Sequence, residues 1–519
     1  MRTLKASGLP FLALKLSTPL LPALLVVGIL HFRYGTNIYE HAPVWNDEVG
    51  YWHQAATFAA VGFQGGYYSY NENVARATWT RFDVHGPWYP MLYGTLGRLL
   101  GGWELYTGVL LNLILFSAST GIFVLTVQPS ILQLITLGLV LASMHPVLLY
   151  LPSTMSEGMQ ASITMLLAAI FWRLLRQREQ AKPWQLVAYG AFLWIVTVTR
   201  LSWGILLLPF FLLVFPFNVR GVGLALLMTA LSSASAYLAM NWVTPQQAYH
   251  SVLLTLNAFG ESWSAGIAAL VERFLYNAGR YFDTSKSAID LLLTVQTILV
   301  FLMTTLALVA SLLLRNASRR MTFWIGASSR ELSFHLYNLT AILVTSFFLY
   351  IIGTFGDYRV VGLHLLLTLV LLVMSDHFLS PLAFSAIFFM GLPFFFNASD
   401  YFMHYDGVHF GDHERVQQIQ LPPELRYDPN ASSPWCNTLV IDVSLYRDFL
   451  VAVPPGIGIS WVLSFQDWQG ETLRSRYVWM RGERAANEAF AAARQLSLRY
   501  LDDVPGGQLY LNEASACSD

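Results

Sequence analysis

The sequence predicts an all-α polytopic membrane protein with about eleven transmembrane helices and a small C-terminal α/β domain. Two bulk features indicate the membrane part: 55% of the 519 residues are hydrophobic and only 12% are charged, whereas a soluble domain carries roughly a quarter charged residues. A change of composition indicates the second domain, because 16 of the 31 acidic residues follow residue 399.

The charge balance excludes nucleic acid as a partner, since the formal net charge is −1 and no Lys/Arg-rich run occurs. The first apolar segment, 11–31, follows Arg2 and Lys5. It is longer than a signal-peptide apolar region, and no small-residue cleavage site follows it. We therefore expect a retained membrane anchor.

The spans are predicted from apolar windows of about 20 residues. The segment 184–218 can be one long tilted helix or two short helices hinged at Thr199 and Arg200. The predicted spans are 11–31, 104–126, 130–151, 157–175, 184–199, 201–218, 221–241, 289–314, 334–352, 359–375 and 379–396.

The positive-inside rule gives this arrangement an orientation. With an odd number of spans, the N-terminus is expected in the cytoplasm and the C-terminal domain outside the membrane. The basic residues that then share the cytoplasmic side are Arg2, Lys5, Arg173, Arg176, Arg178, Lys182, Arg220, Arg315, Arg319, Arg320 and Arg330.

Two domains are expected. Residues 1–397 form the transmembrane module, with a first outer loop at 32–103 and an outer loop at 242–288 whose mixed polarity favours a helix lying in the membrane interface. Residues 398–519 form the extracytoplasmic α/β domain. Its predicted strands are 438–443, 458–465 and 507–512, and its predicted helix is 483–496.

The only two cysteines, Cys436 and Cys517, lie near the start and the end of this outer domain. An oxidising compartment would allow them to form a disulfide. The alternative is a pair of free buried thiols.

Charged residues gather at the outer ends of the predicted spans. Transporters more often place carboxylates near the middle of the membrane, at interrupted helices. Because ionisable groups are costly in the membrane, their placement reports on function. The distribution therefore favours chemistry at the outer surface.

The segment "VWNDEVGYWH", residues 44–53, places Asp47 and Glu48 shortly after the first span. One interpretation is structural: Asn46 caps a helix, and acids in its first turn complement the helix dipole. The functional interpretation is that one carboxylate acts as a base on an acceptor hydroxyl or amine. Adjacent helical residues point about 100° apart, so the other carboxylate would orient its partner or a cation.

Two further outer positions carry alternatives. His85 opens "HGPWYP", which is either an aromatic interfacial turn or a platform on which His85 donates to a phosphate. Glu157 begins the fourth span, either as part of a capping box with Thr154 or as a substrate-binding acid.

Two arginines are candidates for phosphate binding. Arg200 lies at an outer turn, where it either extends toward the membrane surface or binds a substrate. Asp357, Tyr358 and Arg359 form a very short outer loop. This loop is either a surface ion pair or a place where an arginine clamps a phosphate headgroup.

Residues 401–414 hold the weak metal candidates His404, Asp406 and His409. Such a density of nitrogen and oxygen ligands could hold a divalent cation. The spacing matches no metal motif, and a solvated polar loop is the alternative.

This arrangement resembles the GT-C superfamily of polytopic glycosyltransferases, which includes protein O-mannosyltransferases and aminoarabinose transferases of lipid A. The resemblance covers the topology of residues 1–400 and short motifs: the acidic pair after span one, the His85–Pro90 segment, and an acid at the start of span four. The family's late "R-Y-x-x-P" segment is present only as "DYRVVGLH", with Tyr358 and Arg359 transposed and no proline.

The resemblance implies an inverting sugar transfer from a polyprenyl-phosphate-linked donor to a lipid, glycan or protein acceptor. Asp47 would deprotonate the acceptor, and groups such as Arg200 and Arg359 would neutralise the departing phosphate. Some members of the superfamily use a divalent cation for this purpose, and others do not.

Two other functions are alternatives. A transporter or flippase for a lipid-linked glycan predicts inverted repeats and polar residues at the membrane midplane. A non-catalytic scaffold or receptor would not require eleven spans and a long acidic first loop.

Overall fold

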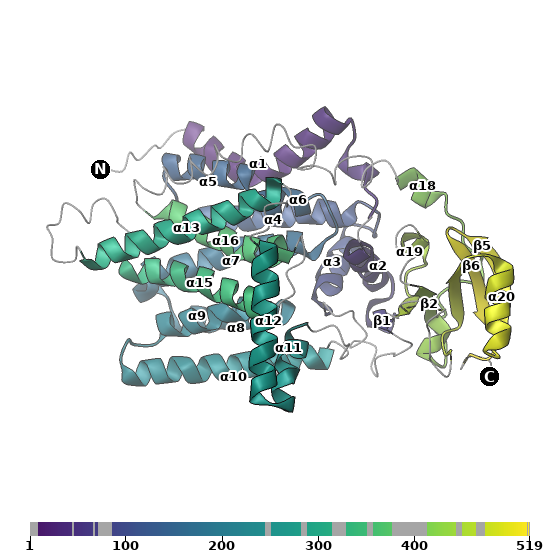
Figure 1. The fold of residues 1–519 in the computed structure, drawn as a ribbon. Coiled ribbons are helices and arrows are strands. Elements are labelled where there is room, and N and C mark those ends of the chain that lie inside the picture. The colour runs from purple at the N-terminus through teal and green to yellow at the C-terminus, as the bar shows by residue number, and fades with distance from the viewer. Residues whose placement is uncertain are drawn as a thin grey trace.

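The computed structural model describes residues 9–43, 46–65, 68–70, 86–243, 251–281, 288–313, 328–349, 356–375, 413–442, 449–462, 465, 473–515 and 517. An elongated bundle of helices makes up most of the molecule, and a small sheet covered by helices lies at one end of the bundle (Figure 1). The predicted fold class, a helical membrane protein with a C-terminal α/β domain, is confirmed.

The described helices of the bundle follow the predicted spans through residue 375, whereas the predicted span 379–396 lies outside the described residues. A helix is the required form because it satisfies its own backbone hydrogen bonds in lipid. Among the described residues, six helices are long and apolar enough to cross a membrane: α1 (Leu9–Tyr34), α4 (Thr107–Val127), α7 (Ser156–Arg176), α10 (Val219–Val243), α13 (Ala288–Leu313) and α15 (Ser329–Leu349). The shorter apolar helices are α5 (Ile131–Ser143), α8 (Pro183–Thr199), α9 (Leu207–Val214) and α16 (Gly356–Met374).

The segment predicted as one span at 130–151 is divided in two. Helix α5 ends at Ser143, Met144 is extended, and a short helix α6 (His145–Tyr150) follows. Pro146 has no backbone N–H to donate to the carbonyl of Ala142, so a continuous helix would lose a hydrogen bond at this point.

The ambiguous segment 184–218 is also two helices. Helix α8 ends at Thr199, and Arg200 is extended with φ −156° and ψ 111°. A 3-10 turn, η5 (Leu201–Leu206), then leads into α9. The break frees Arg200 from helical geometry, which allows its side chain to reach the start of α7.

The outer segment 251–281 forms α11 (Ser251–Glu261) and α12 (Trp263–Tyr281). Helix α12 runs across the direction of α10 and α13 (Figure 1). It is fixed to α15 by Asn277, which donates to the carbonyls of Ser346 and Phe347. Its exposed Trp263, Ile267 and Val271 recur at one-turn intervals, which is the apolar stripe that an interface-plane helix requires.

The first outer loop contains η1 (Ile38–Glu40), α2 (Asn46–Val61), η2 (Gly62–Gln64), β1 (Tyr68–Tyr70) and α3 (Trp88–Leu99). Helices α2 and α3 pack closely at Gly94, where a Cβ atom would lie 2.8 Å from the carbonyl oxygen of Ala55. Only glycine permits this approach. Helix α3 therefore packs against the helix that carries Asp47 and Glu48.

The C-terminal domain is built on a six-stranded sheet with the order β1-β3-β2-β4-β6-β5, to which the first outer loop contributes β1. The pairs β1–β3, β3–β2 and β2–β4 are parallel, and β4–β6 and β6–β5 are antiparallel. Strands β4 and β5 were not predicted. The elements are α18 (His413–Gln417), η7 (Pro434–Asn437), β2 (Thr438–Asp442), α19 (Phe449–Ala452), β3 (Gly458–Val462), β4 (Tyr477–Arg481), α20 (Arg484–Ala493), β5 (Leu498–Val504) and β6 (Gly507–Asn512).

The first outer loop and the C-terminal domain are joined. Strand β1 pairs with β3, with Tyr68 opposite Ile459. The Thr57 hydroxyl accepts a hydrogen bond from the backbone N–H of Gly456 at 3.1 Å. Trp52 of α2 belongs to the same buried apolar cluster as Ile459. Helix α2 is therefore held between the bundle and the soluble domain.

Cys436 and Cys517 form a disulfide, with their Cα atoms 5.4 Å apart. Of the two alternatives for these cysteines, the structure contains the bonded pair. The bond ties the beginning of the domain to its end.

Candidate active site

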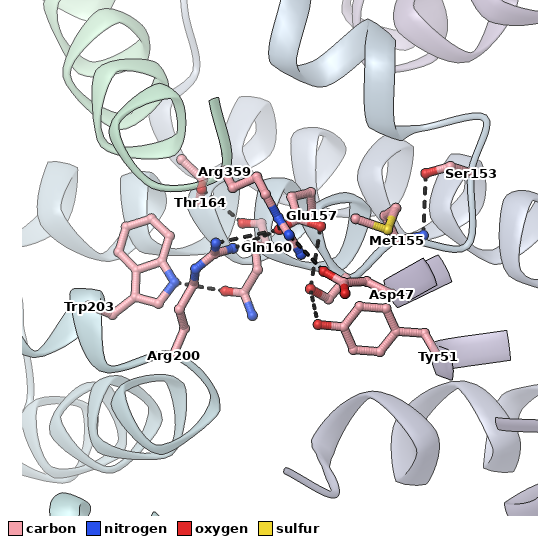
Figure 2. Close-up of polar contacts among 11 residues, drawn as sticks. Asp47, Tyr51, Ser153, Met155, Glu157, Gln160, Thr164, Arg200, Trp203 and Arg359 are labelled. Carbon is pink, nitrogen blue, oxygen red and sulfur yellow. Dashed lines mark hydrogen bonds and ion pairs between the residues drawn. The ribbon is translucent and has the colours of Figure 1, made fainter. Parts of the chain in front are cut away.

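Four charged side chains that are far apart in sequence meet where α2 contacts the bundle (Figure 2). Asp47 comes from the first turn of α2 and Glu157 from the first turn of α7. Arg200 comes from the break after α8, and Arg359 from the first turns of α16. Sequence reasoning had proposed each of these residues, and the fold brings all four together.

Arg359 bridges the two acids. Its Nε donates to Oε1 of Glu157 at 2.7 Å, and its Nη1 donates to Oδ2 of Asp47 at 2.7 Å. The exposed fractions of the two acidic side chains differ: 1% for Glu157 and 33% for Asp47. One carboxylate is thus enclosed by protein, and the other is accessible to solvent.

Arg200 approaches the same enclosed carboxylate. Its Nη1 and Nη2 each lie 3.4 Å from Oε1 of Glu157. Two guanidinium groups therefore face a single oxygen atom. One buried carboxylate balances only one of these positive charges, and Asp47 supplies the second negative charge of the cluster.

Glu48 points away from this cluster and is fully buried. Its Oε1 accepts a hydrogen bond from the backbone N–H of Thr154 at 2.8 Å and lies 3.1 Å from Nε2 of His41. These contacts tie α2 to the loop before α7. Because adjacent helical residues point about 100° apart, Asp47 and Glu48 face different partners.

Of the two alternatives for Glu157, the capping box with Thr154 is absent. Helix α7 begins at Ser156 after an N-cap at Met155 that makes no side-chain cap hydrogen bond. The Thr154 hydroxyl donates to the backbone carbonyl of Glu48 instead, and Glu157 binds the two arginines. The side chains of Thr154 and Glu157, which a capping box would have used, make tertiary contacts instead.

Sequence reasoning missed Tyr51 and Ser156. The Ser156 hydroxyl donates to the Tyr51 hydroxyl at 3.0 Å and lies 3.5 Å from Oε2 of Glu157. Burial, and then the negative charge of Glu157, raise the pKa of Tyr51 well above its usual value, so the phenol stays neutral. The spacing of Asp47 and Tyr51, one helical turn apart, is the sequence signal that could have identified Tyr51.

A second group missed by sequence reasoning lies behind Arg200. Trp203 is buried, and its Nε1 donates to Oε1 of Gln160 at 2.8 Å (Figure 2). Gln160 lies on α7 close to one turn after Glu157. The contact fixes η5, and with it the position of Arg200, against α7.

The remaining candidates are not placed by the structure. His85, His404, Asp406 and His409 lie outside the described residues, and of Tyr358 only the backbone, in the first turn of α16, is described. In the described part of the chain, no group of three or more His, Cys, Asp or Glu side chains could hold a metal ion.

The cluster has the chemical features of an anion-binding site with an adjacent base. Two arginines can bind phosphate oxygens through charge-assisted hydrogen bonds. A solvent-accessible carboxylate beside them can accept a proton from a hydroxyl or amine.

No protein-family model and no curated protein matches the sequence. Among solved structures, the chain is similar to the crystal structure of ArnT from Cupriavidus metallidurans bound to undecaprenyl phosphate. The sequence identity is 14% and the TM-score is 0.38, and the alignment covers 98% of this chain and 99% of that one.

Proposed function

We propose that the protein is an inverting glycosyltransferase that moves a sugar from a polyprenyl-phosphate-linked donor to an acceptor at the outer face of the membrane. The observation that carries this proposal is the cluster itself. An accessible carboxylate, Asp47, pairs with Arg359, and Arg359 shares the buried carboxylate of Glu157 with Arg200 at one end of a membrane bundle. A lipid-borne phosphate needs cations to bind it, and a neutral acceptor needs a base to take its proton.

In the proposed reaction, Asp47 takes the proton from the acceptor hydroxyl or amine as that group attacks the anomeric carbon. The bond between the anomeric carbon and the phosphate oxygen breaks on the opposite face of the sugar, and its electrons stay on the phosphate. Arg200 and Arg359 stabilise the charge that develops there, which lowers the barrier more than mobile cations in water would.

The other residues of the cluster position the proposed base and the proposed phosphate ligands. Glu157 positions both guanidinium groups through one oxygen atom. Glu48 was predicted as part of the catalytic pair. We propose that it positions α2, and its burial and its contacts with His41 and Thr154 support this role. His85 and Tyr358 remain proposed substrate ligands on their sequence motifs.

The proposed orientation places the site outside the cytoplasm. The disulfide favours an oxidising compartment for the C-terminal domain. Arg176 and Arg178 lie at the far end of α7 from Glu157, as the positive-inside rule requires of the cytoplasmic end.

The test is Asp47→Asn in cells that lack the native gene, with envelope lipids and glycans analysed by mass spectrometry. The wild-type chain should restore a hexosyl or pentosyl modification. Because removal of a general base costs about 10²–10⁴ in rate, the variant should not restore it, although it inserts normally.

The matched control is Asp502→Asn, which removes an exposed acid from β5 in the soluble domain. This variant should behave like the wild type. Full restoration of the modification by Asp47→Asn would contradict the proposed role of the carboxylate. A flippase for a lipid-linked glycan would instead leave a lipid-linked intermediate on the wrong leaflet in the deletion strain.

A further inference from the structure

We infer that the Asp47 carboxylate occupies, in the free protein, the position on Arg359 that the donor phosphate takes, so that donor binding releases Asp47 to act as the base. The inference rests on the proposed function. It assigns a fixed order of events to the site: the donor phosphate binds first, and the base becomes available second.

The two positive charges of the cluster require a second anion besides Glu157. Arg200 and Arg359 bring two positive charges to one oxygen of Glu157. Because Glu157 carries a single negative charge, the pair of guanidinium groups retains a surplus positive charge. In the free protein Asp47 neutralises it, at 2.7 Å from Nη1 of Arg359.

Of the two carboxylates, Asp47 is the one that can leave. Glu157 is 1% exposed and faces three guanidinium nitrogens. Asp47 is 33% exposed, and one nitrogen of Arg359, Nη1, donates to it. An incoming anion therefore displaces Asp47, while Glu157 keeps both arginines in place.

A phosphate is well matched to this exchange. Guanidinium groups bind phosphate oxygens through two parallel N–H donors, and a tetrahedral phosphate can present oxygens to Arg200 and Arg359 together. The displaced Asp47 then no longer pairs with Arg359 and lies next to the bound donor. A carboxylate held by an arginine is a weaker base than one that has been released.

The same exchange operates in reverse after transfer. The departing polyprenyl phosphate carries one more negative charge than the donor diester did, so it binds the arginines more strongly. Asp47 holds the acceptor proton at this stage and does not compete. Once Asp47 loses this proton, its carboxylate returns to Arg359 and favours release of the product.

The decisive experiment measures the affinity of a polyprenyl phosphate without a sugar for the purified full-length protein in lipid nanodiscs. If Asp47 competes with the phosphate, only the molecules in which Asp47 has left Arg359 can bind the probe. The apparent dissociation constant is then higher than the intrinsic one. Asp47→Asn should therefore bind the probe about 10-fold more tightly than the wild type, although it is inactive in sugar transfer.

Two further variants complete the test. Asp502→Asn should bind as the wild type does, since it lowers the net negative charge equally without contacting Arg359. In an Arg359→Gln background, Asp47→Asn should give no gain in affinity, because the competition is for that arginine.

Unchanged or weaker binding by Asp47→Asn overturns the inference and leaves the proposed function standing. If the wild type itself fails to bind the polyprenyl phosphate, the proposed function is wrong, and the inference fails with it. A gain that persists in the Arg359→Gln background would show a general charge effect and would also overturn the inference.

Discussion

The two ends of α7 carry ion pairs that look alike but have different surroundings. At one end Glu157 lies 2.7 Å from Arg359, and at the other end Arg176 lies 2.7 Å from Glu331 of α15. Both acids are 1% exposed, and the arginines are 25% and 28% exposed. Distance and burial alone do not distinguish a candidate active site from a structural contact.

The difference lies in what the neighbouring cations do. Near Glu331, Arg178 donates to the carbonyl of Val214 and Arg330 donates to that of Leu213. These carbonyls end α9, so the arginines satisfy unpaired helix-terminal acceptors and complement the helix dipole. Arg176, Arg178 and Arg330 thus each have a structural partner at this end.

At the Glu157 end, the second arginine faces the same carboxylate as the first, and a partly exposed acid completes the charge balance. Two arginines that share one buried carboxylate, with an accessible carboxylate as the balancing charge, are therefore the feature that distinguishes this end of α7. The following predictions test this distinction.

The largest effect is expected from Glu157→Gln. Removing one member of a buried ion pair costs about 3–5 kcal/mol, since the remaining charge stays buried without compensation. Here two arginines lose the charge that holds them together. Glu331→Gln affects one arginine that is 28% exposed, so its cost should be smaller. Thermal unfolding in nanodiscs measures both, and equal destabilisation would remove the distinction between the two ends.

A second prediction concerns the attachment of α2 to the soluble domain. Burial lowers the pKa of His53 from 6.5 to about 4, against the opposing effect of a hydrogen bond to the backbone of Pro454. The folded state therefore binds fewer protons than the unfolded state below pH 6.5. Stability is fully present above pH 6.5 and is lost as the pH falls toward 4, by about 3 kcal/mol in total.

The measurement is the thermal midpoint between pH 7 and pH 4 for the wild type and for His53→Gln. The variant should lose less stability on acidification, because its side chain does not titrate. Hydrogen exchange at residues 46–61 locates the effect to α2. Identical pH profiles for the two proteins would show that His53 does not control this attachment.

The smallest of these effects is expected on polyprenyl phosphate binding, when Arg359→Lys is compared with Arg176→Lys. One ammonium group cannot reproduce the two separate nitrogens that Arg359 directs to Asp47 and Glu157. We expect polyprenyl phosphate binding to weaken about 10–100-fold, or about 1.4–2.7 kcal/mol. Arg176→Lys should leave binding unchanged, and an equal loss in both variants would point to a general defect of folding.

Local sequence patterns predicted much of the fold. Apolar runs of span length have to become helices in lipid, so the predicted spans agree with the described helices through residue 375. The break at Met144 was missed because hydropathy averages over Pro146. The strands β4 and β5 were missed because short strands at 477–481 and 498–504 carry weak periodicity.

The site was predicted in part. Sequence placed Asp47 in the first outer loop and Arg200 and Arg359 at the outer ends of spans. The family resemblance favoured Asp47 as the base, but no local pattern distinguished it from Glu48. The choice depends on which side of α2 faces the bundle, and that is fixed by Trp52 and its neighbours packing into the soluble domain. Tyr51 was missed for the same reason.

The sequence by itself determined the helical membrane bundle, the polar ends of its spans and the separate composition of the C-terminal domain, because hydrophobicity and charge act through local patterns. Only the tertiary structure decided that β1 of the outer loop joins the C-terminal sheet. It also decided that Asp47 meets an arginine 312 residues away. Contacts of this kind depend on how helices pack, and no pattern within one segment encodes the partner of another.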